Sequence, residues 1–136
     1  MTLKPLAGHV MARRRLSKAL ANGQLPQVML MTGPEGVGKQ RLALWLAQLV
    51  LCEAPAEEPC GRCRACQLVL GLAHADLHWI VPIPRPKAGE PDKQMEEAAE
   101  SIAELLEERR KAPLYSPPDG MSAHGMATAR LVARRA

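Results

Sequence analysis

The stretch that most restricts the fold is GPEGVGK at residues 33–39, which fits the phosphate-loop pattern G-x-x-x-x-G-K. This pattern is informative when a strand precedes it and a helix follows it. The apolar run VMLMT at 28–32 predicts a buried parallel strand, and the largely apolar segment 39–51 predicts a helix buried on most sides. Glycines and a helix N-terminus together direct backbone N–H groups toward a phosphate. The sequence therefore predicts an α/β phosphate-loop domain.

Hydrolysis of a nucleotide requires more than this loop. A Ser or Thr after the lysine normally joins the Mg²⁺ shell, and an acidic residue ending a later strand holds the metal from the other side. Gln40 stands where that hydroxyl is needed, and no later apolar strand pattern ends in Asp or Glu. Three interpretations remain open: ATP bound without efficient turnover, an empty loop retained as scaffold, and a true ATPase. We expect no autonomous ATPase activity and predict no catalytic residue. The predicted nucleotide-binding residues are Gly33, Pro34, Glu35, Gly36, Val37, Gly38, Lys39 and Gln40.

The second strong feature is a group of four cysteines, Cys52, Cys60, Cys63 and Cys66. Four thiolates are the ligand set of a closed tetrahedral Zn²⁺ site, and Gly61 permits a tight turn between two of them. An iron–sulfur cluster or a redox C-x-x-C pair would use the same residue type. Structural zinc explains all four cysteines beside a phosphate loop more simply, so we predict a zinc module at about 52–70.

The remaining pattern is mostly helical. Apolar spacing predicts helices at 8–20, 67–73, 94–111 and 123–135, and a second strand is predicted at 77–83. With Trp45, Trp79 and Tyr115 as the only aromatic residues, the core has to be aliphatic. No apolar run approaches the roughly 18 residues of a membrane span, and the N-terminus lacks the pattern of a signal peptide. The sequence predicts a cytoplasmic protein with no membrane contact.

A phosphate loop whose helix runs into four clustered cysteines resembles the N-terminal part of the bacterial DNA polymerase III clamp-loader subunits. The resemblance extends from about Gly8 to Val81 and is carried by LPQVMLMTGPEGVGK, LCEAPAEEPCGRCRACQ and HADLHWI. Gln40 and HADLHWIVP make the chain similar to the delta-prime type more than to the gamma and tau motor type, which carries G-K-T. The resemblance implies an AAA+ fold, the four cysteines as zinc ligands, and a stator role in loading the sliding clamp onto primed DNA. The implied partners are the other clamp-loader subunits, the sliding clamp and primer–template DNA.

Two alternatives and one departure accompany this interpretation. The alternatives are a P-loop ATPase motor of the gamma or tau type and a zinc-stabilised nucleic-acid-binding module with basic ends at 13–15 and 130–135. The arginines in these ends lack aromatic neighbours for base stacking. Because a phosphate-loop sheet usually has about five strands, we interpret 1–136 as a partial AAA+ domain. Its strand at 28–31 is then expected to expose backbone and apolar side chains.

Overall fold

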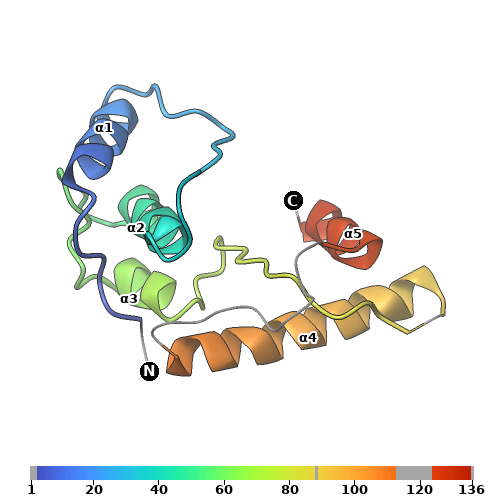
Figure 1. The fold of residues 1–136 in the computed structure, drawn as a ribbon. Coiled ribbons are helices and arrows are strands. Elements are labelled where there is room, and N and C mark those ends of the chain that lie inside the picture. The colour runs from blue at the N-terminus through green and yellow to red at the C-terminus, as the bar shows by residue number, and fades with distance from the viewer. Residues whose placement is uncertain (1–2, 88, 113–123, 136) are drawn as a thin grey trace. The chain divides into compact units, whose positions relative to one another are not determined.

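The computed structural model describes residues 3–87, 89–112 and 124–135, which contain five α-helices and no β-strand. The helices are α1 (Val10–Ala21), α2 (Lys39–Leu51), α3 (Arg64–Leu70), α4 (Pro91–Lys111) and α5 (Met126–Arg135), as Figure 1 shows. The chain divides after Leu77 into two compact units, an N-terminal unit and a C-terminal unit. None of the helices in the described residues is long and apolar enough to cross a membrane.

The predicted parallel sheet of the AAA+ type is wrong for the part of the chain that the structure describes. Neither 28–32 nor 77–83 forms a strand there. A β-strand requires backbone hydrogen bonds to a neighbouring strand. The segment 28–32 belongs to the N-terminal unit and nearly all of 77–83 to the C-terminal unit, so neither has a second strand candidate in its own unit. The apolar runs are present, but the described residues hold no backbone partners that would make them strands.

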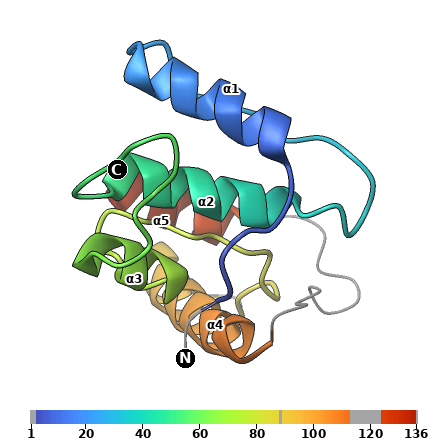
Figure 2. The same ribbon diagram turned by 90° about the vertical axis from the view of Figure 1, so that its left-hand side faces the viewer.

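In the N-terminal unit, α2 lies between α1 and α3, and both views of the ribbon show this order (Figures 1 and 2). Its predicted and observed bounds agree at 39–51. Trp45 and Leu49 on α2 are 3% and 1% exposed and form the centre of the core of the unit. Apolar residues from α1, α2 and the flanking loops pack around them: Leu6, Leu16, Leu20, Leu25, Met31 and Leu42. The predicted aliphatic core is confirmed, with one tryptophan at its centre.

Two helices of this unit begin at places that the apolar spacing did not predict. The first, α1, begins at Val10 because His9 adopts a left-handed conformation with φ 54°, which is incompatible with helix. Helix α3 begins at Arg64 rather than at 67, because the Cys63 sulfur accepts the Cys66 N–H and caps the helix. Both starts depend on a residue outside the apolar period.

The C-terminal unit consists of α4 and α5 with the chain that precedes α4. Helix α4 begins at Pro91 rather than at 94, consistent with the tolerance of the first helical turn for proline. A small core joins the two helices and contains Ile83, Ala98, Ile102, Ala127 and Leu131. An exposed pair between Arg134 and Asp92, at 3.0 Å, adds little to this packing. The predicted start of the last helix at 123 lies outside the described residues.

The predicted apolar exposure of 28–31 is confirmed for Val28, Met29 and Leu30, which are 87%, 38% and 88% exposed. Met31, expected to be exposed with them, packs against the core instead. Exposed apolar groups of this kind promote association and dye binding. Replacing Val28 and Leu30 together by serine is expected to lower fluorescence of a hydrophobic dye about twofold. Val50→Ser, at an exposed position on α2, is the control and should leave the signal nearly unchanged.

Candidate metal centre and phosphate loop

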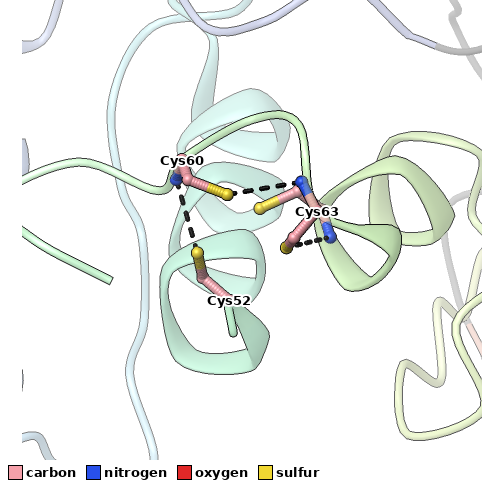
Figure 3. A group of neighbouring side chains, drawn as sticks. Cys52, Cys60 and Cys63 are labelled. Atoms are coloured by element: carbon pink, nitrogen blue, oxygen red, sulfur yellow. Dashed lines mark hydrogen bonds between the residues drawn. The ribbon is translucent and has the colours of Figure 1, made fainter. Parts of the chain in front are cut away.

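The four cysteines converge from three parts of the N-terminal unit. Cys52 follows the last residue of α2, Cys60 and Cys63 lie in the connecting loop, and Cys66 lies in the first turn of α3. None forms a disulfide, and their four sulfur atoms lie within 4.8 Å of one another. Figure 3 shows the sulfur atoms of Cys52, Cys60 and Cys63 gathered toward a common point. The four thiols could hold a metal ion.

Backbone N–H groups reinforce this cluster in a regular sequence. The N–H of Cys60 donates to the sulfur of Cys52 at 3.3 Å, and the N–H of Cys63 donates to that of Cys60 at 3.3 Å. The N–H of Cys66 donates to the sulfur of Cys63 at 3.4 Å. Figure 3 marks interactions of this series with dashed lines. Donors aimed at sulfur stabilise the thiolate form, which is the form that binds metals.

The surroundings shift the pKa values of two of the thiols in opposite directions. Hydrogen bonds from the backbone of Arg62 and then of Cys63 lower the pKa of Cys60 to about 6. Burial raises the pKa of the Cys66 thiol, whose residue is 0% exposed. The thiolate form of Cys60 is therefore favoured, whereas an ion that binds Cys66 has to displace its proton. Metal binding at such a site is coupled to proton release.

Two glutamines fix the segment that carries the cysteines, one through the first turn of α3 and one through the loop before it. The Gln48 side chain on α2 is buried and donates to the Cys66 carbonyl at 3.3 Å. The Gln67 side chain on α3 donates to the Gly61 carbonyl at 2.5 Å. Gly61 itself has φ 69°, so the tight turn predicted there is confirmed. Neither glutamine was identified from the sequence, although a polar residue within the apolar α2 segment signals a specific buried partner.

Glu58 connects the same loop to the helices. Its carboxylate accepts the indole N–H of Trp45 at 2.8 Å and pairs with the guanidinium of Arg13 at 3.2 Å. The Arg13 guanidinium also lies 6.0 Å from the centre of the Trp45 ring. The loop between the first two cysteines is thus attached to both α1 and α2. Sequence reasoning missed Glu58, which is one of several acidic residues in a polar loop and has no distinguishing local pattern.

The predicted phosphate loop is closed on itself. The Lys39 ammonium donates to the carbonyls of Gly33 and Pro34, each at 2.8 Å. Gly36 and Gly38 have φ 75° and 96°, values that glycine adopts without strain. An anion entering the loop has to compete with these two carbonyls for the lysine. The structure places the predicted nucleotide-binding residues in this loop and the start of α2, and their binding role stays a prediction.

A histidine outside the loop, His9 at the N-cap of α1, contacts the loop. Nε2 of His9 lies 2.6 Å from the Val37 carbonyl oxygen, so the ring nitrogen is the donor. A side chain at Gly38 would meet the same ring nitrogen at 3.2 Å, so the ring also packs closely against the loop. The GH dipeptide at 8–9 is noticeable in the sequence, but its contact with a loop 28 positions away is not.

The fold and the two sites define a class of protein in which a glycine-rich loop and a four-cysteine cluster occupy the two ends of one helix. A protein-family model described as DNA polymerase III, delta subunit, matches residues 8–118. The chain therefore belongs to that family.

Individual relatives agree with this assignment. The chain is 30% identical over 69 residues to the DNA polymerase III subunit delta' of Haemophilus influenzae, covering 51% of this chain and 21% of that protein. It is 35% identical over 95 residues to the subunit delta' of Pseudomonas aeruginosa, covering 68% and 29%. It is 34% identical over 71 residues to the DNA polymerase III subunit tau of Bacillus subtilis, covering 52% and 12%. The chain thus spans less than a third of the length of these relatives. No matching solved structure was found.

Proposed function

We propose that the chain is part of a delta-prime-type component of the DNA polymerase III clamp loader, which helps place the sliding clamp on primed DNA. The observation that carries the proposal is the family match over residues 8–118, supported by two relatives named subunit delta'. The partners that follow are the other clamp-loader subunits, the sliding clamp and, through the assembly, primer–template DNA. The component is a stator, without chemistry of its own.

The relative named subunit tau supports a second candidate, an ATP-hydrolysing motor subunit. Gln40 argues against it, because the amide replaces the hydroxyl that normally joins the Mg²⁺ shell. The structure also directs the Lys39 ammonium to carbonyls of its own loop. Both features favour a component that transmits contacts within an assembly over one that turns over ATP.

Reconstitution tests the proposal. The complete natural gene product is mixed with the other clamp-loader subunits of the same organism. Co-elution in gel filtration is then measured. Clamp loading onto primed circular DNA is then compared with and without the protein. We expect co-elution and a loading rate that depends on the protein. Separate elution together with unchanged loading would contradict the proposal.

We further propose that the cysteine cluster holds one Zn²⁺ in a module at about 52–70. A tetrahedral site with Zn–S bonds of about 2.3 Å brings its sulfurs to about 3.8 Å from one another. The four sulfurs lie within 4.8 Å of one another, so a small inward movement suffices. In a four-iron cluster each cysteine binds a different iron around a bulky core, which requires wider spacing. The compact arrangement therefore supports a single ion held by Cys52, Cys60, Cys63 and Cys66.

For the phosphate loop we propose weak ATP binding without efficient turnover. An entering phosphate would take the Lys39 ammonium away from the Gly33 and Pro34 carbonyls, which lowers the net gain. The backbone N–H groups of the loop and the start of α2 supply the remaining attraction. Gln40 gives Mg²⁺ a poor ligand, so binding should depend little on the metal.

Gln40→Thr is expected to raise Mg²⁺ dependence of ATP binding without creating an ATPase. The threonine hydroxyl restores one ligand of the metal, but no later apolar run in residues 1–136 ends in the Asp or Glu that would supply the acidic ligand. Titration with a fluorescent ATP analogue, with and without Mg²⁺, measures the first effect, and phosphate release measures the second. Lys39→Ala is the control and should abolish binding. Turnover that requires Mg²⁺ and is lost in Lys39→Ala would favour the motor interpretation, and a failure of every form to bind would favour an empty scaffold.

A further inference from the structure

We propose that His9 is a positioning residue for the phosphate loop and that α1 thereby couples the loop to the cysteine site. The coupling would link ligand binding at the phosphate loop with metal binding at the four cysteines, and its biological role rests on the proposed function. Its physical basis lies within the N-terminal unit. His9 at the start of α1 contacts the loop, and Arg13, one turn later on the same helix, contacts the chain between the cysteines.

The first connection is the contact between His9 and the loop. The ring nitrogen donates to the Val37 carbonyl at 2.6 Å, and the ring fills the space beside Gly38 where a side chain would otherwise fit. Because Gly38 directly precedes α2, a shift of the ring moves the backbone at the helix N-terminus, where N–H groups would face a bound anion. His9 sits there in the left-handed conformation, with φ 54°, which has a cost for a residue with a side chain. The contact compensates for this backbone strain.

The second connection is the contact between Arg13 and the cysteine loop. Glu58 precedes Cys60 by one intervening residue and binds the Arg13 guanidinium at 3.2 Å and the Trp45 indole at 2.8 Å. The Arg13 side chain is 18% exposed and that of Glu58 is 53% exposed, so water screens the ion pair in part. The backbone N–H of Arg13 also donates to the His9 carbonyl at 2.9 Å. Arg13 and His9 are therefore joined through one helical turn.

The phosphate loop and the cysteine region are therefore connected in two ways, through α2 and through the side chains of α1 and its N-cap. Helix α2 runs from Lys39 beside the loop to Leu51 beside Cys52, and α1 bridges the same two regions through side chains. Any change that releases Glu58, including loss of an ion from the neighbouring cysteines, loosens the first turn of α1 at Arg13 and with it the ring of His9, while Leu16 and Leu20 keep the rest of the helix on the core. The coupling is reciprocal, so an anion that orders the loop favours the ordered cysteine site.

The test is hydrogen exchange in the full chain, measured by mass spectrometry on peptides covering 33–38 and 52–66. Glu58→Gln is compared with its neighbour Glu57→Gln, which is also exposed. We expect Glu58→Gln to raise exchange in the loop peptide about threefold, the size of one partly screened ion pair. Glu57→Gln should leave it unchanged. Equal loop exchange in the two variants would overturn the coupling.

Two variants of His9 separate its hydrogen bond from a general effect on stability. His9→Ala should raise loop exchange about fivefold, the usual net value of one hydrogen bond. His9→Gln keeps an N–H donor at a similar reach and should restore most of the protection. In the double variant with Glu58→Gln, loop exchange should match that of His9→Ala alone, because the connection is already cut. Equal exchange in His9→Gln and His9→Ala, or additive effects in the double variant, would overturn the role of His9.

Cobalt absorption and ATP titration are recorded on the same samples. These two measurements report metal and ATP binding independently of loop exchange, so a loss of the proposed ligands can be told apart from a loss of the coupling. A chain that binds neither metal nor ATP but whose loop responds to Glu58→Gln has the coupling without the proposed ligands. A chain that binds both, with a loop indifferent to Glu58→Gln, has the ligands without the coupling.

Discussion

Replacing Cys66 by serine is expected to abolish tight metal binding and to loosen residues 52–70. Cys66 is 0% exposed, and its sulfur belongs to the group that converges within 4.8 Å. Serine offers a hard oxygen that is protonated at neutral pH, so one of four soft ligands is lost. Changing residues that merely support a metal ligand costs about 10- to 100-fold in affinity, and loss of a ligand should cost more. Because ion binding contributes directly to folding, the loop loses its order as well.

Metal analysis of freshly reduced protein and absorption of the cobalt-loaded form measure the first effect. Hydrogen exchange in 52–70 measures the second, and the helical amides of α2 should remain protected because its core packing is untouched. Ala54→Ser introduces the same serine at an exposed position of the loop and should bind metal as the parent does. Iron in the purified protein would show that the assigned metal is wrong, and undiminished zinc in Cys66→Ser would show that the assigned ligand set is wrong.

The elements that the sequence predicted well are those decided by local pattern. Helix α2 has its predicted bounds because a largely apolar segment lies between Gly38 and Cys52, where the backbone is left-handed and extended, respectively. The segments 28–32 and 77–83 were predicted as strands from the same kind of apolar run. A strand, unlike a helix, requires a partner from elsewhere in the chain, and their described surroundings supply none. Apolar pattern alone could not reveal that difference.

The candidate site divides in a similar way. The convergence of the four cysteines followed from their number and spacing, and the structure brings them together. The contacts of Gln48, Glu58 and His9 depend on how helices pack, because each joins residues at least 13 positions apart. Of these three, Gln48 carried a usable signal, since it is polar in a segment that is otherwise nearly all apolar. Such a residue indicates a buried hydrogen bond before its partner is known.

Leu49→Ala is expected to reduce the unfolding free energy of the N-terminal unit by about 2–5 kcal/mol, the usual cost of truncating a buried leucine. Leu49 is 1% exposed and lies in the cluster formed with Trp45 and Leu46. It occupies the helix that joins the phosphate loop to Cys52, so a cavity there weakens both ends. Trp45 fluorescence and far-UV circular dichroism during urea unfolding measure the change.

Val50→Ala is the matched control, because Val50 follows Leu49 on the same helix but is 49% exposed. It should change the free energy of unfolding by less than about 1 kcal/mol, as exposed substitutions generally do. Excess Zn²⁺ should recover part of the loss in Leu49→Ala, because an ion that binds the folded state at 100 times its dissociation constant adds about 2.7 kcal/mol. The same excess should do nothing for a Leu49→Ala variant that also carries Cys66→Ser. Recovery in that double variant would mean that zinc stabilises the unit through residues other than the four cysteines.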